Sequence, residues 1–160
     1  MEFVQPIRDI DKIEEIKSIL RRFSNRNYFL FVFGINVGMR ISDILGLQVR
    51  DILKKSHIQI IEGKTGKVKK FRLMTLQEEI VEYTQGMRLN EYVFASRQNG
   101  GKPITRSMAY RILNGAAKKS GVLEIGTHTL RKTFGYHFYK RIYGVALLQR
   151  ILITHRPRSP

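Results

Sequence analysis

The sequence predicts one mainly helical domain with a small antiparallel β-sheet, an α+β fold, and three observations support this. Most apolar residues recur at the three- and four-residue spacing of helices. A single pair of neighbouring segments has the composition of a β-hairpin, with a glycine-containing turn between them. The 160 residues, 42% of them hydrophobic, suffice for one core, and neither repeats nor low-complexity segments divide the chain.

Three helices are predicted in the first part of the chain. Residues 9–23 carry isoleucine and leucine at helical spacing with charged residues between them, which predicts an amphipathic helix. Residues 26–37 are apolar on nearly every side, as in a helix buried at the centre of a domain, and Gly38 ends it. Ser42 is then the expected cap of a short helix that ends near Gly46.

A β-hairpin follows these helices. Residues 57–62 and 67–73 both have strand character, and the two glycines within residues 63–66 favour a turn between them. Beyond the hairpin, residues 76–85 are predicted to form a helix and residues 92–96 a short strand. The sheet is therefore expected to be small beside the helical part.

The last third of the chain is predicted to be helical again. Thr105 is the expected cap of a helix that Gly121 closes, and Thr127 the expected cap of the next helix. Gly144 is predicted to separate that helix from a last amphipathic piece over residues 145–152. Three apolar residues spaced four apart should line the buried side of the longer helix, namely Leu130, Phe134 and Phe138.

Charge is the strongest feature of the composition. Lys and Arg total 29 against 13 Asp and Glu, a net charge of +16, which favours a polyanionic partner, with nucleic acid foremost. A basic surface without a partner is the alternative. The absence of cysteine excludes disulfides and thiol chemistry and fits the cytoplasm. The start of the chain lacks a signal-peptide pattern, and the most apolar run, residues 28–35, is too short to span a membrane.

Candidate phosphate ligands lie near two helix ends. His128 and Arg131 are three residues apart, so they share a face near a helix start, where free N–H groups also bind anions. Arg40 stands between the buried helix and the next one, where packing should hold a guanidinium that grips phosphate through two N–H groups. Asp43 is expected to hold a neighbouring side chain. A solvated basic pair and a purely structural Arg40–Asp43 ion pair are the alternatives.

The hairpin turn carries Lys64 between glycines. A lysine on a turn that can move over a substrate is a candidate general acid, although most turn lysines are simply solvated. Further lysines along the second strand and beside Arg131 are expected to contact a DNA backbone. These lysines are Lys67, Lys69, Lys70 and Lys132.

Taken together, in this order and at this spacing, these segments resemble the tyrosine recombinase (phage integrase) family. The resemblance runs from about residue 10 to residue 152 and implies the DNA breaking-rejoining fold of that family's catalytic domain. It also implies double-stranded DNA as substrate, with neither a metal nor another cofactor. The matching stretches are residues 38–47, 62–67, 128–134 and 145–152.

The resemblance implies a mechanism in which a tyrosine hydroxyl attacks a DNA phosphodiester. A 3′-phosphotyrosyl link forms, a 5′-hydroxyl leaves, and the 5′-hydroxyl of a second strand reverses the attack. Arg40 and Arg131 match the two arginines that clamp the phosphate, and Asp43 the acidic residue that supports them. His128 matches a histidine that assists proton transfer, and Lys64 the lysine that donates a proton to the leaving oxygen.

The chain departs from the family in domain organisation. Family members usually carry a smaller DNA-clamping domain before the catalytic one, whereas residues 1–160 are expected to be a single, C-terminally truncated catalytic domain. The resemblance therefore implies a weaker and less selective grip on DNA. Intact members form tetramers on DNA, and a monomer is expected for this shorter form.

The second departure is at the C-terminal end, where the family continues into a helix bearing the nucleophilic tyrosine. His155 stands one residue late for the family's second histidine, and Tyr136, Tyr139 and Tyr143 lie in the wrong helix to be the nucleophile. Loss of one base after the Leu152 codon would turn a family-like Asn-His-Ser-Ser-Pro-Ser-Leu-Thr into the observed ending. His155 would then be an accident of reading frame.

The expected function is site-specific DNA recombination or integration by a bacterial or phage protein of the nucleoid. This chain is expected to bind DNA and to be inactive alone. One alternative is a non-catalytic DNA-binding remnant or regulator of a recombination site. Another is a fragment that receives its tyrosine from a second chain. A type IB topoisomerase would use a similar clamp, but residues 147–152 and the short hairpin are closer to the integrases.

Overall fold

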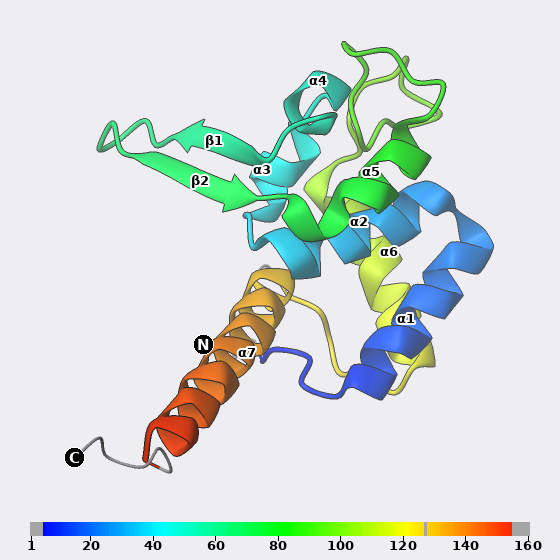
Figure 1. The fold of residues 1–160 in the computed structure, drawn as a ribbon. Coiled ribbons are helices and arrows are strands. Elements are labelled where there is room, and N and C mark those ends of the chain that lie inside the picture. The colour runs from blue at the N-terminus through cyan, green and yellow to red at the C-terminus, as the bar shows by residue number, and fades with distance from the viewer. Residues whose placement is uncertain (1–4, 127, 155–160) are drawn as a thin grey trace.

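The computed structural model describes residues 5–126 and 128–154, apart from a few side chains within the helices. These residues form mostly helices with one two-stranded antiparallel sheet, which confirms the predicted fold class (Figure 1). The elements are α1 (Ile10–Phe23), α2 (Asn25–Val37), α3 (Ile41–Leu45), α4 (Val49–Ile52), β1 (His57–Ile61), β2 (Val68–Arg72), the 3-10 helix η1 (Met74–Leu76), α5 (Gln77–Thr84), α6 (Arg106–Lys119) and α7 (Thr129–Thr154).

Helix α2 lies at the centre of the core, as its apolar sequence predicts. Its middle is fully buried and packs against α1, α5, α6 and α7. Phe29 stacks on Tyr83 of α5 with ring centroids 4.4 Å apart, and Phe94 packs against the same rings. The hydroxyl of Tyr83 donates a 2.6 Å hydrogen bond to the carbonyl of Val93, so its one polar atom is satisfied inside the cluster.

The helix ends are set by local side-chain contacts that the sequence indicates. The side chains of Asp9, Ser24 and Thr105 each accept a backbone N–H in the first turn of α1, α2 and α6. Gly121, just beyond α6, has a φ of +72°. The predicted helices over residues 9–23, 26–37 and from Thr105 onward are therefore confirmed to within a residue or two.

Helices α2 and α7 cross closely at two glycines, Gly34 within α2 and Gly38 directly after it. A Cβ on Gly34 would lie 2.5 Å from Cδ1 of Leu130. A Cβ on Gly38 would overlap the ring of Phe134. Gly38 also has a φ of +79°, which residues with a side chain rarely adopt. The crossing therefore requires that neither position carries a side chain.

The segment before α1 is hydrogen-bonded to the first half of α7. The backbone N–H of Ile7 donates to Oγ1 of Thr133 at 2.9 Å, and Nε2 of His137 donates to the carbonyl of Ile7 at 2.9 Å. The side chain of Ile7 is itself buried. The N-terminal segment thus packs on the first half of α7 and stabilises the position of that helix.

Three expectations for the last third of the chain need correction or fall outside the described residues. Helix α7 continues through Gly144 to Thr154, because a glycine inside a helix costs about 1 kcal/mol relative to alanine and does not forbid the helix. Phe138 is 47% exposed rather than buried, because the packed side of α7 ends with the partly buried Phe134. Thr127, the expected cap, lies outside the described residues.

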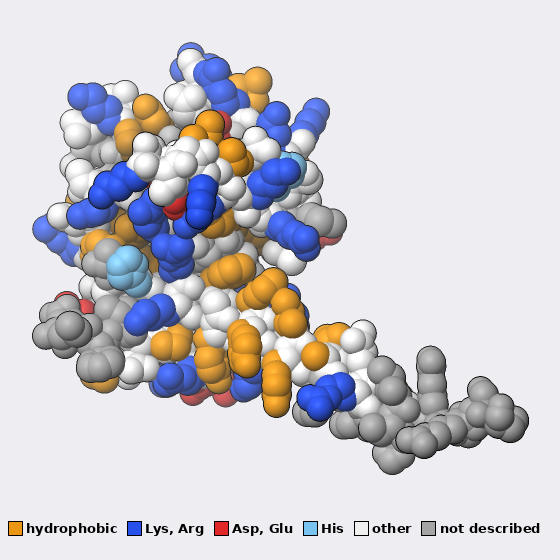
Figure 2. Space-filling view, turned by 90° about the vertical axis from the view of Figure 1, so that its left-hand side faces the viewer, with side chains coloured by type: hydrophobic (Ala, Val, Ile, Leu, Met, Phe, Trp, Pro, Cys, Tyr) orange, Lys and Arg blue, Asp and Glu red, His pale blue; other side chains and the backbone are white. Residues whose placement is uncertain are grey.

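The part of α7 from Phe138 onward projects from the body of the molecule, and an apolar row lies along it (Figures 1 and 2). Its exposed large apolar residues are Phe138, Tyr139, Ile142, Tyr143, Val145 and Leu152. Basic residues interrupt this part of the helix, among them Lys140 and Arg141. Neither α7 nor any other described helix combines the length and the apolar character that crossing a membrane requires.

Two local predictions in the first hundred residues are wrong. Ser42 is not a cap, because α3 begins at Ile41 and the residue before it is Arg40, whose backbone is extended at φ −64° and ψ 144°. Residues 92–96 form no strand, because the chain turns between two isolated bridges, Gln48–Tyr92 and Ala95–Pro103. Helix α4 was not predicted, since four residues are too few to show a period.

Replacing Gly38 with alanine should destabilise the domain strongly. The methyl group would overlap Phe134, and the left-handed backbone adds a strain of about 1–2 kcal/mol. Gly121→Ala is the matched control, because Gly121 has a similar φ but its Cβ would meet only Nζ of Lys12 at 3.7 Å. In urea titrations we expect a loss of about 1 kcal/mol for the control and about 3 kcal/mol for Gly38→Ala. Equal losses would contradict a crossing that depends on Gly38.

Alkaline pH should weaken the fold through Tyr83. Burial raises the pKa of Tyr83 to about 12, although the charges of Arg26 and Arg97 act to lower it. In the unfolded chain the same hydroxyl ionises near 10.0, so the unfolded state loses its proton first. The stability that Tyr83 contributes is therefore complete below pH 10.0 and is lost as the pH rises toward 12.

The measurement is the urea midpoint at increasing pH for the wild-type chain and for Tyr83→Phe. The phenylalanine variant should lose about 1 kcal/mol near neutral pH, because the hydrogen bond to Val93 disappears. Its stability should then fall less steeply than that of the wild type at alkaline pH. Parallel curves for the two proteins would show that Tyr83 does not ionise abnormally.

Candidate functional site

A small hollow lies where α3, the hairpin and the start of α7 meet. It is lined by Arg40, Asp43, Ile60, Glu62, Lys69, Phe71 and Arg131. Arg40 and Arg131, both predicted as phosphate ligands, are far apart in the sequence, yet both line this hollow. Asp43, the predicted supporting residue, lines it with them. The hollow contains three cationic and two anionic side chains, so its formal charge is positive.

Arg40 is held between two helices and still presents free donors. Its carbonyl accepts the N–H groups of Asp43 and Ile44, which fixes the backbone at the start of α3. Its Nε lies 3.3 Å from Oδ2 of Asp43, and the Arg40 side chain is 51% exposed. Among the described residues its two terminal nitrogens have no hydrogen-bond partner. The ion pair therefore orients the guanidinium and leaves its outer edge open to an anion.

Arg131 is placed by the packing of its own helix. It lies in the first turn of α7, directly after Leu130, which is buried against Gly34 of α2. The loop before α7 is also held, because Nδ2 of Asn114 donates to the carbonyl of Ile125 at 3.0 Å. The partly buried Arg131 therefore enters the hollow from a rigid support.

His128 is the residue immediately before α7. Its carbonyl accepts the N–H of Lys132 at 2.8 Å, so its backbone begins the helix, and its side chain is exposed. His128 is not among the residues that line the hollow. His128 and Arg131 thus both stand at the start of α7, as predicted, but only Arg131 lines the hollow. Lys132, one position beyond Arg131, is exposed and does not line the hollow either.

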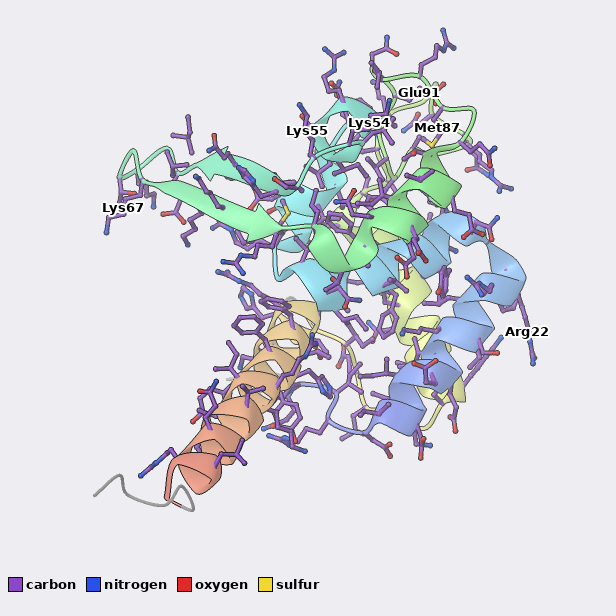
Figure 3. All side chains as sticks on the ribbon, viewed as in Figure 1. Arg22, Lys54, Lys55, Lys67, Met87 and Glu91 are labelled. Carbon is purple, nitrogen blue, oxygen red and sulfur yellow. The ribbon has the colours of Figure 1, made fainter. Side chains whose placement is uncertain are left out.

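The lysines of the hairpin fall on different faces. Ile60 pairs with Lys69 and Gln59 pairs with Lys70, so Lys69 shares the face of Ile60 and Lys70 lies on the opposite face. Only Lys69 lines the hollow. The turn that carries Lys64 is at the outer end of the hairpin, where Figure 3 also shows Lys67 pointing away from the body.

Glu62 is a member of the hollow that the sequence did not single out. Its Oε1 lies 2.6 Å from Nζ of Lys69 on the facing strand. The hydrogen bond from Lys69, followed by the charges of Lys69 and Arg40, holds the pKa of Glu62 below its usual range despite partial desolvation. The sequence offers one indication of this ion pair, since Glu62 precedes several lysines. The strand register was needed to identify which lysine is its partner.

A second, open groove of about 930 Å³ runs along α4 and β1. Asp43 lines both this groove and the hollow. Lys54, at the end of α4, has a φ of +59°, a rare value for a residue with a side chain. Figure 3 shows Lys54 and Lys55 near α4 on the same side of the body as the hairpin. Further basic side chains in the groove are Arg50 and His57.

The face that carries the hairpin is rich in Lys and Arg side chains, with few acidic ones (Figure 2). Over residues 5–126 and 128–154, no tyrosine lines the hollow and no three His, Asp or Glu side chains come together as metal ligands would. Tyr136, Tyr139 and Tyr143 are spread along α7, where Tyr139 and Tyr143 stack at 5.9 Å. His155 lies outside the described residues.

Known proteins are similar to this chain over most of its length. The probable integrase/recombinase YoeC of Bacillus subtilis is 55% identical over 158 residues, which cover 98% of this chain and 87% of YoeC. The tyrosine recombinase XerA of Pyrococcus horikoshii is 26% identical over 146 residues. That match covers 89% of this chain, which spans only half the length of XerA.

A solved structure has the same fold. The lambda integrase fragment bound to DNA superposes with a TM-score of 0.66 at 18% identity, over 89% of this chain and 54% of that one. At that identity the likeness concerns the fold alone. The model of the phage integrase family matches residues 9–156. The family match, together with the 55% identity to YoeC, shows that this chain belongs to the phage integrase family, the tyrosine recombinases.

Proposed function

We propose that this chain binds double-stranded DNA across the hollow and acts in site-specific recombination by tyrosine recombinase chemistry. The observation that carries the proposal is the convergence of Arg40 and Arg131, from two separate helices, on one hollow. The net charge of +16 supports a DNA partner, because lysine and arginine release counterions when they neutralise phosphates. We also propose that residues 1–160 are one catalytic domain, which the family match over residues 9–156 supports.

The two arginines suit a phosphodiester in reaction. When a tyrosine oxygen adds to phosphorus and the 5′-oxygen leaves, negative charge accumulates on the non-bridging oxygens. Two guanidinium groups fixed on either side can hold those oxygens with paired N–H donors. Asp43 serves this arrangement by orienting Arg40 through the 3.3 Å ion pair. Rigid placement matters because donors that need not reorganise stabilise the transition state most.

Two further groups are assigned roles that require motion on DNA binding. Lys64, on the turn at the outer end of the hairpin, would donate the proton to the leaving 5′-oxygen after the hairpin bends toward DNA. A Cβ added to Gly63 or Gly66 would meet nothing within 4 Å, so the turn has space to move. His128 would bind a non-bridging oxygen beside the first turn of α7. Lys67, Lys70 and Lys132 would contact neighbouring phosphates.

A second candidate function follows from the tyrosines. Since no tyrosine of the described residues lines the hollow, this chain would bind DNA without cleaving it or would use a tyrosine from another chain. A non-catalytic occupant of a recombination site and an acceptor of a tyrosine in trans share the same DNA-binding surface. They differ in whether cleavage appears when a tyrosine-bearing relative is added.

Replacing Arg131 with alanine should weaken duplex DNA binding by about tenfold near 0.1 M salt, because one charge-assisted phosphate contact is lost. The slope of log affinity against log salt concentration should fall by about 1. Arg22→Ala is the matched control, since it removes the same charge from α1, where Figure 3 shows Arg22 pointing away from the side of the hairpin. Fluorescence anisotropy with a labelled duplex measures both quantities.

Arg40→Ala should behave as Arg131→Ala does, because both line the same hollow. If Arg22→Ala weakened binding as much as the two hollow variants, DNA would be held by net charge rather than by this site. Absence of salt-sensitive DNA binding by the wild-type chain would contradict the proposed function altogether.

The 160-residue chain alone should form no covalent adduct with a nicked duplex that traps a 3′-phosphotyrosyl link. The reason is that Tyr136, Tyr139 and Tyr143 are spread along α7 and do not line the hollow. Denaturing gels after incubation detect such an adduct, with an intact tyrosine recombinase on its own site as the positive control. An adduct from this chain, mapped by mass spectrometry to one of these tyrosines, would contradict the expectation.

A further inference from the structure

The ion pair between Glu62 and Lys69 occupies an unexpected place, inside a hollow that we assign to a phosphate. Oε1 of Glu62 and Nζ of Lys69 are 2.6 Å apart, closer than the 3.3 Å between Nε of Arg40 and Oδ2 of Asp43. Both residues line the hollow together with Arg40 and Arg131. A carboxylate in such a place repels a phosphate, so its presence calls for a physical reason.

The backbone of Glu62 is firmly anchored at the base of the hairpin turn. Its N–H donates to the carbonyl of Lys67 at 2.9 Å, and its carbonyl accepts the N–H of Gly66 at 2.8 Å. The side chain is also near Oγ1 of Thr65, at 3.5 Å. Because both backbone groups are bonded, Glu62 is a fixed point from which its carboxylate can hold a longer, more flexible side chain.

Lys69 needs such a fixed point if it is to act in the hollow. A lysine ammonium is strongly hydrated and sits on four freely rotating bonds, so an exposed lysine is spread over many positions. Its side chain is 46% exposed, and strand alternation directs it to the face shared with Ile60 and Phe71. The pair with Glu62 holds the ammonium at the hollow that Arg40 and Arg131 also line.

We propose that Lys69 is the third phosphate-binding cation of the hollow and that Glu62 is its positioning residue. An ammonium group has three N–H donors, so Lys69 can keep its bond to Glu62 and donate another to a phosphate oxygen. The carboxylate of Glu62 stays charged near neutral pH, as its lowered pKa requires, and is therefore able to hold Lys69 there. The inference deepens the proposed function and rests on it, since it requires DNA in the hollow.

Lys69→Gln tests the first half of the inference. Loss of one phosphate contact should reduce the slope of log affinity against log salt concentration by about 1 and weaken duplex binding by about tenfold near 0.1 M salt. Lys118→Gln is the matched control, because it removes the same charge from the last turn of α6, which contributes no residue to the hollow. Lys69→Arg, which keeps the charge, should retain the wild-type slope. Equal effects of Lys69→Gln and Lys118→Gln would overturn the assignment of Lys69.

Glu62→Gln tests the positioning role in two backgrounds. If Glu62 only repels DNA, its replacement should tighten binding by the same factor with Lys69 present or replaced by glutamine. If Glu62 positions Lys69, the replacement should tighten binding clearly in the Lys69→Gln background and fail to do so in the wild-type background. Equal tightening in both backgrounds would overturn the positioning role, because the two sites would then be uncoupled.

These outcomes are distinguishable from failure of the proposed function. Wild-type DNA binding and its weakening in Arg131→Ala test the hollow as such, whereas the cycle between positions 62 and 69 tests only the inference. Each variant is compared with the wild type by urea unfolding, and Glu62→Asp is measured beside Glu62→Gln. Glu62→Asp keeps the charge on a shorter side chain, so it should restore part of the coupling if positioning is electrostatic.

Discussion

The close crossing of α2 and α7 is the contact on which the candidate site depends. Gly34 and Gly38, four residues apart at the end of α2, let Leu130 and Phe134 of α7 settle directly against the backbone. Arg40 follows Gly38 by two residues, and Arg131 follows Leu130 by one. A wider crossing would separate these arginines, so the absence of two side chains in the core determines the width of a charged hollow at the surface.

The same crossing explains why the hollow can hold like charges close together. Arg40 and Arg131 come from elements that hydrophobic packing and the Ile7–Thr133 hydrogen bond already hold in place. Each acid in the hollow lies beside a cation, Asp43 with Arg40 and Glu62 with Lys69. These two ion pairs offset part of the repulsion among the three cations when no phosphate is bound. The aromatic cluster around Phe29 and Tyr83 stabilises the other side of α2.

Prediction succeeded where a local signal was strong. The periodic apolar residues of α1, the all-apolar α2, the hairpin and the Thr105 cap of α6 are each visible within a dozen residues. Prediction failed where the local structure depends on packing against distant parts of the chain. The chain turns at residues 92–96 despite strand-like composition, and α7 passes through Gly144, because one glycine lowers helix stability without ending the helix.

The sequence by itself determined the mainly helical fold, the basic character and the choice of Arg40, Asp43 and Arg131 as candidate site residues, because each depends on short-range patterns or on composition. Only the tertiary structure decided which of the basic residues share one hollow. It separated Lys69 from Lys70 by strand register, left Lys64 at the far end of the hairpin and brought in Glu62. Proximity between distant segments arises from packing, and no local pattern in the chain encodes it.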